Sequence, residues 1–320
     1  MPDRGLRSQG MRDLGPDEMT RFRAVERAFL DATAAAGYRE VRTPSIEPLH
    51  LYSASGTLSP QALERVYSFL DWNGWSGERV VLRPDTTVAV ARWYGDQPAG
   101  GVERVSYVQP VFRFAPEGER EVWQCGIELF GSADGADAEV LALAQRFLAA
   151  AGIEDLSVEL AHAGLARAAF AAAGLSTAEQ LASYARMLEG DANLTAELAA
   201  AHPDGAAAVR LLADVDGSSA GYVANLRAAM PSVIPGAEPA LDDLEGAAKA
   251  LDGVGVPYRI LAGTARNFEY YTGITFRFLS GDRTVLSGGR YDRLAETLGG
   301  PSAPGCGWAA NVLGLIGARS

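Results

Sequence analysis

Hydrophobic and polar residues follow two patterns along the first part of the chain, one with the spacing of a helix and one typical of strands. From Pro16 to Ala36 the apolar positions recur at helical spacing, at Phe22, Val25, Ala28, Phe29 and Ala32. This spacing predicts an amphipathic helix that ends at Gly37. Runs with strand character follow, together with one short helix at Thr86–Tyr94. The expected strands are Glu40–Pro44, Tyr67–Trp72, Glu78–Arg83, Val105–Phe114 and Glu121–Gly131.

The pattern changes between Ala136 and Asp252, where alanine-rich segments with regularly placed leucines predict a series of helices. We expect them at 136–151, 163–173, 177–189, 194–201, 205–213 and 238–252, with one short strand at 156–161. Strand patterns resume at 258–261, 274–279 and 284–287. The sequence therefore predicts an α+β fold, an antiparallel sheet flanked by helices. Its core is expected at 1–162 and 256–320, split by a helical insertion at 163–255.

Composition narrows the class of protein. The 320 residues are 48% hydrophobic, which is enough for a substantial core. A net charge of -12 disfavours a nucleic-acid partner, whose phosphates usually require a basic surface. The 2 cysteines and 3 histidines are too few and too scattered for a disulfide framework or a metal site. Without a long apolar run or a signal-like N-terminus, we expect a cytoplasmic protein with no membrane partner.

Several polar residues have the chemistry to hold a free amino acid. A zwitterion needs acceptors for its ammonium group and donors for its carboxylate. Asp85, Thr87 and Gln124 can supply the acceptors, and Arg113 and Arg266 can supply charge-assisted hydrogen bonds to the carboxylate.

Glu128 follows Gln124 by four residues, so the two side chains share one face of the predicted strand. Two polar groups on that face favour a binding role. The alternative is a glutamate at a sheet edge that is simply solvated, and spacing alone slightly favours this alternative.

A second signal is the pair Tyr270 and Tyr271. Adjacent tyrosines on a strand face opposite ways, so one can reach a pocket while the other packs inside. A tyrosine hydroxyl is a natural partner for an imidazole or a carboxylate. Two core tyrosines bonded to backbone would give the same pattern. The pair Gly288-Gly289, further along the sequence, would allow a ligand to approach the backbone closely, but such a pair is more typical of a turn.

Taken in order, these segments resemble the histidyl-tRNA synthetase-like branch of class II synthetase cores, over nearly the whole chain. They look closest to the regulatory subunits of ATP phosphoribosyltransferase. The segments that carry the resemblance are GMRD at 10–13, LRPDTTVAVAR at 82–92, REVWQCGIELFG at 120–131, AHAG at 161–164 and RNFEYYTG at 266–273. Authentic synthetases usually have LRPEGT at the second of these, so Asp85 favours the regulatory subunits. Asn267 replaces a glycine of the family pattern.

The resemblance implies a histidine-binding pocket. In it Asp85, Thr87 and Gln124 hold the ammonium group, and Glu128 and Tyr271 hold the imidazole. Arg113 or Arg266 holds the carboxylate, while Tyr270 is expected to pack.

The departures from the synthetases concern ATP. The synthetases have His-Glu after the Arg113-like residue, where this chain has Phe114-Ala115. Their closing motif ends in an arginine that lies against the ATP phosphates, and here the aligned residue is Gly314. No anticodon-binding domain is expected after Ser320. We therefore expect neither tRNA charging nor any cofactor or catalytic residue.

The resemblance predicts a noncatalytic subunit that activates a short-form ATP phosphoribosyltransferase catalytic subunit and relays feedback inhibition by histidine. The chain is expected to dimerise and to assemble with that catalytic partner. Two alternatives stay open from the residues alone. One is a ligase that adenylates histidine, and the other is a free-standing amino-acid sensor with a different protein partner.

Overall fold

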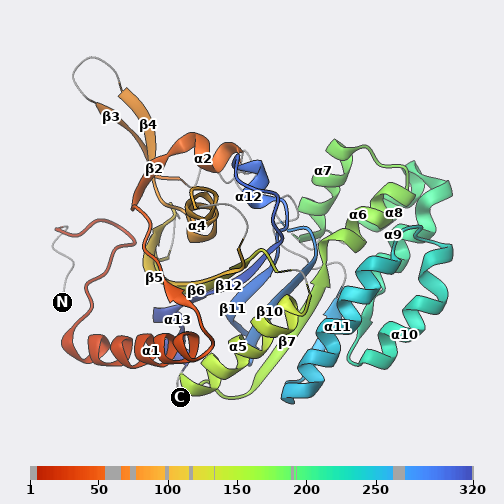
Figure 1. The fold of residues 1–320 in the computed structure, drawn as a ribbon. Helices are drawn as coiled ribbons and strands as arrows, with labels where there is room; N and C mark the ends of the chain where they lie inside the picture. The colour runs from red at the N-terminus through yellow and green to blue at the C-terminus, as the bar shows by residue number, and fades with distance from the viewer. Residues whose placement is uncertain are drawn as a thin grey trace. The chain divides into compact units, whose positions relative to one another are not determined.

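The computed structural model divides into two units. Figure 1 shows the helices and strands along the chain. One unit comprises 1–132, 146–154 and 293–320, and the other comprises 133–145 and 155–292. The structure describes residues 6–54, 66–72, 77–97, 101–114, 118–132, 134–188, 191, 193–261 and 271–318. The division expected at 163 and 255 stays a prediction.

In the first unit four strands run in the order β1-β5-β6-β12, and three others form a small sheet in the order β2-β4-β3. The strands of the larger set are β1 (Arg39–Glu40), β5 (Glu103–Phe112), β6 (Glu121–Phe130) and β12 (Gly305–Asn311). Those of the small sheet are β2 (Ile46–Pro48), β3 (Ser68–Trp72) and β4 (Gly77–Leu82). The helices are α1 (Pro16–Ala35), α2 (Leu49–Ala54), α4 (Thr86–Gly95), α12 (Leu294–Thr297) and α13 (Val312–Ala318).

Helix α1 covers one face of β6 and β12 because its apolar stripe meets aromatic side chains there. Phe22 meets Trp123 at a ring-centroid distance of 5.5 Å, and Phe29 meets Trp308 at 5.9 Å. Phe147, in the C-terminal part of α5 (Ala136–Ala150), stacks on Trp308 at 5.6 Å. The predicted amphipathic helix is thus confirmed.

The segment after β1 differs from the predicted strand at 40–44. Only Arg39–Glu40 pair with β5 in the described structure, and they do so in parallel. Beyond them, the Val41 N–H still donates to the Ser106 carbonyl of β5 at 2.9 Å, and side chains then provide hydrogen bonds to the backbone at Thr43 and Pro44. The Gln109 amide accepts from the Thr43 N–H at 3.2 Å, and Arg83 donates to the carbonyls of Thr43 and Pro44 at 2.8 and 2.6 Å. A pattern of apolar positions could not show that side chains replace the strand ladder.

In the second unit five strands run in the order β11-β10-β7-β9-β8. They are β7 (Leu156–His162), β8 (Asp216–Gly217), β9 (Tyr258–Leu261), β10 (Ile274–Ser280) and β11 (Arg283–Arg290). Its helices are α6 (Ala163–Ala172), α7 (Thr177–Leu188), α8 (Leu194–Ala201), α9 (Ala206–Ala213), α10 (Ala220–Ala229) and α11 (Glu238–Val254). Short 3-10 turns lie at Pro203–Gly205 and Met230–Ser232.

The predicted α+β class, with helices flanking a sheet, is confirmed, but the strands are not all antiparallel. β7 pairs with β9 in parallel, as β1 does with β5. The helices α6–α11 lie between β7 and β9 in the sequence and provide the long crossover that a parallel pair needs. The helix α10 and the two-residue strand β8 were missed by the sequence analysis. None of the helices in the described ranges is long and apolar enough to cross a membrane.

Candidate functional site

The N-terminus of α4 presents Asp85, the last residue of the LRPD segment. Its carboxylate caps the helix by accepting the Val88 N–H at 3.3 Å. Its main-chain carbonyl accepts the Tyr52 hydroxyl at 3.0 Å. The side chain stays half-exposed, so Asp85 has a structural role as a cap and can still meet a ligand.

Arg113 lies beside Asp85 with opposite charge. Its Nη2 is 3.6 Å from Asp85 Oδ2, and its Nε donates to the Pro84 carbonyl at 2.7 Å. The second hydrogen bond fixes the guanidinium close to the helix N-terminus. An amino acid carries its ammonium and carboxylate groups on one carbon, so an adjacent carboxylate and guanidinium complement a zwitterion.

One face of the strands β5, β6 and β12 carries polar side chains; we call it the polar face. The register places Tyr107 opposite Gly126, Gln109 opposite Gln124, and Gly307 opposite Glu128. Because directly paired residues point to the same side of a sheet, one set of alternate positions forms this face. Its members are Val105, Tyr107, Gln109, Gln124, Gly126, Glu128, Gly307, Ala309 and Asn311.

Glu128 is buried in the middle of the polar face. Its side chain is 1% exposed, and β6 is flanked by β5 and β12, so the solvated sheet-edge alternative is wrong. The Tyr107 hydroxyl donates to Glu128 Oε1 at 3.1 Å. Burial, followed by the charges of Glu128 and Asp85, raises the pKa of Tyr107 well above its ordinary value. Tyr107 therefore remains a neutral donor to Glu128.

Gln124 is held on the same face by α4. The Thr86 hydroxyl donates to Gln124 Oε1 at 3.2 Å. An amide oxygen accepts two hydrogen bonds, so the same oxygen can take a second donor such as an ammonium group. The structure thus places Thr87 on α4 and places Gln124 and Glu128 on β6, with Gln124 bonded to Thr86 of α4 and Glu128 bonded to Tyr107.

Two glycines make room for these polar side chains. A Cβ on Gly126 would lie 2.4 Å from the Tyr107 hydroxyl oxygen. A Cβ on Gly307 would lie 2.1 Å from Glu128 Oε2 and 2.2 Å from the Ile127 carbonyl oxygen. Neither approach is possible for a real side chain, so glycine at both positions preserves the placement of the Tyr107–Glu128 pair.

The positions expected to meet ATP in a synthetase carry no charge. Phe114 packs edge-on against Tyr67 at 5.9 Å, and the Arg120 guanidinium lies over its ring at 4.3 Å. Ala115 lies outside the described residues. Gly314 lies in α13, where its N–H is accepted by the Asn311 side chain at 3.2 Å.

Tyr271 belongs to the second unit and precedes β10 rather than lying within a strand. Its ring lies over Gly289 of β11, where a Cβ would come within 2.8 Å of it. Gly288-Gly289 is therefore part of a strand and not a turn. Arg266 and Tyr270 lie outside the described residues.

His162, singled out only by its family segment, caps a helix. Its Nδ1 accepts the Leu165 N–H at 3.2 Å, and its Nε2 lies 3.1 Å from Asp243 Oδ2 of α11. The ring is therefore occupied on both nitrogens by the protein. In the described ranges no group of three or more His, Cys, Asp or Glu residues could hold a metal ion.

Two residues with strong roles were missed by the sequence analysis. Tyr107 is one of them, and the only signal for it was the alternation along Val105–Phe114, which does not distinguish a core tyrosine from a site tyrosine. Arg83 is the other. It is 1% exposed and, besides Thr43 and Pro44, donates to the Pro110 carbonyl at 2.7 Å. Its place in the LRPD segment is explained by these structural bonds.

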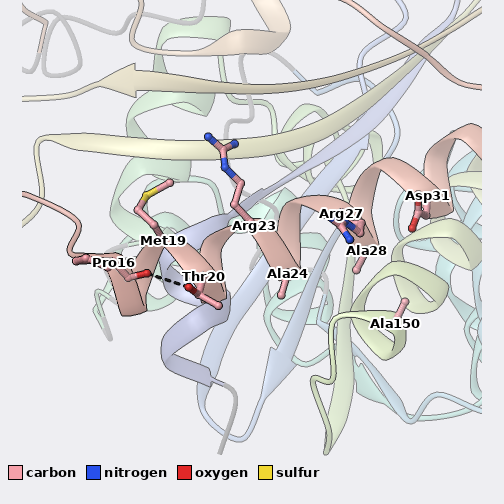
Figure 2. A pocket seen from close by; sticks show the side chains of 9 residues that line it. All are labelled: Pro16, Met19, Thr20, Arg23, Ala24, Arg27, Ala28, Asp31 and Ala150. Atoms are coloured by element: carbon pink, nitrogen blue, oxygen red, sulfur yellow. Dashed lines mark hydrogen bonds between the residues drawn. The ribbon is translucent and has the colours of Figure 1, made fainter.

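A surface groove follows α1 on the first unit (Figure 2). Its volume is about 810 Å³, and it is lined by Pro16, Met19, Thr20, Arg23, Ala24, Arg27, Ala28, Asp31 and Ala150. None of the predicted site residues lines it. Thr20 is bonded to the Pro16 carbonyl at 3.0 Å, and Arg23 forms an ion pair with Glu26. The groove is therefore separate from the polar face.

Comparisons with known proteins identify the family of the chain. A family model described as histidyl-tRNA synthetase matches residues 10–315, so the chain belongs to the histidyl-tRNA synthetase family. An ATP phosphoribosyltransferase regulatory subunit from Dehalococcoides mccartyi (strain CBDB1) is 42% identical over 314 residues, covering 97% of this chain and 76% of that protein. A histidine–tRNA ligase from Synechococcus sp. (strain JA-3-3Ab) is 33% identical over 325 residues, covering 96% of this chain and 73% of the ligase.

Solved structures support the fold. An ATP phosphoribosyltransferase regulatory subunit/histidyl-tRNA synthetase from Bacillus halodurans superposes with a TM-score of 0.85 at 21% identity, covering 100% of this chain and 84% of that one. A histidine–tRNA ligase subunit from Alicyclobacillus acidocaldarius gives a TM-score of 0.79 at 27% identity, with coverage of 98% and 96%. The predicted resemblance and fold are thus confirmed.

Proposed function

We propose that this chain is a noncatalytic regulatory subunit of ATP phosphoribosyltransferase, acting in histidine biosynthesis. It would activate a short-form catalytic subunit and relay feedback inhibition by histidine. The Dehalococcoides mccartyi protein, 42% identical over 97% of the chain, carries the regulatory-subunit name, whereas the Synechococcus ligase is 33% identical.

One observation carries the noncatalytic part of the proposal. The proposed binding of an amino acid is supported by the contact of Asp85 with Arg113 and by the hydrogen bond from Tyr107 to Glu128. In contrast, the two positions that would face a triphosphate are Phe114 and Gly314. Adenylate formation builds up negative charge, and without fixed counter-charges its transition state loses most of its electrostatic stabilisation.

Histidine is the proposed effector. Asp85, Thr87 and Gln124 would accept from its ammonium group. Arg113 or Arg266 would bind the carboxylate, and Glu128 and Tyr271 would bind the imidazole, while Tyr270 would pack. A buried carboxylate such as Glu128 rejects ligands that lack a ring N–H because it would then be left without that partner.

Feedback requires histidine to bind one state of the complex more tightly than another, because equal affinities shift no equilibrium. A coupling free energy of about 1–3 kcal/mol is typical for such effects. We propose that the chain works in the cytoplasm as a dimer assembled with catalytic subunits. The exposed apolar side chains of Leu70 and Trp72 share one face of β3 and offer a surface for protein contact.

The decisive test is formation of phosphoribosyl-ATP by the catalytic subunit from the same organism, measured alone, with this chain, and with added histidine. Activity that rises on mixing and falls with histidine is the expected result. Activation without a histidine response would leave an activator and remove the sensing role. No activation by the matching catalytic subunit would contradict the proposal.

The family also contains ligases, so histidine-dependent exchange of pyrophosphate into ATP is the matched second assay. Exchange by this chain alone would favour a histidine-adenylating ligase. If neither assay responds, proteins that co-purify with the chain from its source cells would identify a different partner, as expected for a free-standing amino-acid sensor.

A further inference from the structure

Helix α6 binds the main chain of the segment that carries Tyr271. Arg167 Nη1 donates to the Tyr271 carbonyl and Nη2 to the Thr272 carbonyl, both at 3.0 Å. The Ala163 N–H donates to the Gly273 carbonyl, also at 3.0 Å. Three successive carbonyl groups are therefore held by the first half of one helix.

The same segment is held from its other side by the end of β11. The Thr272 N–H donates to the Arg290 carbonyl at 2.7 Å, and the Thr272 hydroxyl accepts the Asp292 N–H at 2.9 Å. The Arg290 guanidinium is fixed in turn between Asp137 and Asp292, with contacts of 2.9 and 3.0 Å. With Gly289 beneath its ring, Tyr271 has a single well-defined placement in this unit.

Helix α6 is itself tied to the helical region between β7 and β9. His162 at its N-terminus accepts the Leu165 N–H and contacts Asp243 of α11 at 3.1 Å. A Cβ on Gly164 would lie 2.9 Å from the His162 ring and 3.5 Å from the Thr272 carbonyl oxygen. α6 therefore contacts α11 through its N-cap residue His162 and the Tyr271 segment through Arg167.

We propose that Arg167 is a positioning residue for the effector site: it fixes the main chain of Tyr271 and Thr272 and thereby sets the affinity for histidine from α6. This rests on the proposed function for the identity of the ligand. Arg167 acts through Tyr271 and does not itself need to touch histidine.

Arginine suits this role for a geometric reason. Its planar guanidinium presents two N–H groups in a fixed fork, which matches two neighbouring carbonyl oxygens. Lysine keeps the charge as a single ammonium on a flexible stem, and glutamine keeps one donor group without the charge. Arg167→Lys therefore removes the two-pronged geometry and keeps the charge, whereas Arg167→Gln removes the charge as well. Arg210, an exposed arginine of α9 in the same unit, offers the matched control Arg210→Gln.

The first measurement needs no ligand. Amide hydrogen exchange of Thr272 and Gly273 reports how firmly their N–H groups are held. Arg167→Gln is expected to speed their exchange by about tenfold, because lost hydrogen bonds of this kind lower the free energy of local opening. Arg210→Gln should leave it unchanged. Unchanged exchange in Arg167→Gln, with the fold intact by circular dichroism, would overturn the proposal.

The second measurement is histidine binding by calorimetry. Arg167→Gln is expected to weaken it by about tenfold and Arg167→Lys by less. Adding Arg167→Gln to a chain that already carries Tyr271→Phe should weaken binding less than it does in the wild-type chain, because coupled residues are not additive. Strict additivity would show that Arg167 affects histidine binding independently of Tyr271 and would contradict the proposal.

The two proposals fail in different ways. If the wild-type chain binds no histidine, the sensing role of the proposed function fails and the effect of Arg167 on affinity fails with it. If the wild-type chain binds histidine and Arg167→Gln binds it equally well, the proposed function stands and the positioning role of Arg167 is wrong.

Discussion

The two faces of β5, β6 and β12 are built from alternate residues of the same strands, yet one is packed with aromatic rings and the other carries polar side chains. The face toward α1 is filled by large rings, with Trp123 and Trp308 against Phe22 and Phe29. The polar face instead pairs Tyr107 with a buried Glu128, and these two side chains fill the space over Gly126 and Gly307. Packing of rings stabilises the first face, whereas the second buries polar groups that bond to one another.

This contrast explains how neighbouring residues can have opposite roles. Gly307 and Trp308 are adjacent on β12, but a Cβ on the first would collide with Glu128, while the ring of the second stacks on Phe147. Substitutions on the ring-filled face should therefore change the free energy of unfolding with little effect on binding. Substitutions on the polar face should do the reverse.

The largest effect is expected for Trp308→Ala. Removing a ring that contacts both Phe29 and Phe147 should lower the free energy of unfolding by about 3–5 kcal/mol. Denaturant unfolding followed by far-ultraviolet circular dichroism measures this. Trp72→Ala is the matched control because Trp72 is 65% exposed, and its cost should stay within about 0.5 kcal/mol. Equal losses in the two variants would contradict the assignment of the ring-filled face.

Glu128→Gln probes the polar face with almost no change of shape. The amide oxygen can still accept from Tyr107, but the charge that would hold an imidazole is gone. We expect histidine binding to weaken by about 1.5–3 kcal/mol, the usual loss for a hydrogen bond to a charged group. The free energy of unfolding should stay constant or rise, because a buried charge has been removed.

Calorimetric titration with histidine provides the measurement for this variant. Glu121→Gln, on the same strand but only half-buried, is the control and should bind as the wild type does. If Glu128→Gln kept full affinity while Tyr271→Phe did too, the assignment of the imidazole subsite would be wrong.

The sequence predicted the elements better than the site. Helix α1 follows from its apolar stripe, and the strands β5 and β6 follow from their runs of strand-forming residues. The shared face of Gln124 and Glu128 follows from the same rule. Tyr107 could not be found in this way, because its role depends on the register that places it opposite Gly126 and beside Glu128. These are contacts between segments that are distant in the sequence. The strand expected at 40–44 was wrong for the same kind of reason, since Arg83 and Gln109 bind that backbone from elsewhere in the chain.

Tyr107→Phe tests the polar face by removing the hydroxyl group that donates to Glu128. Removing the hydroxyl deletes the bond to Glu128 without opening a cavity. Histidine affinity should fall by about 1 kcal/mol, roughly fivefold, because Glu128 loses a group that orients it. Tyr94→Phe is a suitable control, because its hydroxyl donates to the Gly101 carbonyl at 3.3 Å and takes no part in the polar face. A fall in affinity equal to that of the control would argue against an orienting role for Tyr107.

The smallest effect concerns Glu47, a buried carboxylate of β2 that contacts Arg92 of α4 at 3.0 Å, away from the residues of the polar face. Burial raises its pKa above the usual 4.5, although Arg92 opposes the shift. The folded chain therefore binds this proton more tightly than the unfolded chain does. The contribution to stability is fully present below pH 4.5 and is lost as the pH rises through the raised pKa. Glu47→Gln should remove this decline, which denaturant unfolding at successive pH values between about 4 and 7 would measure. If the decline persisted in Glu47→Gln but vanished in Glu128→Gln, the pH-sensitive carboxylate would lie on the polar face.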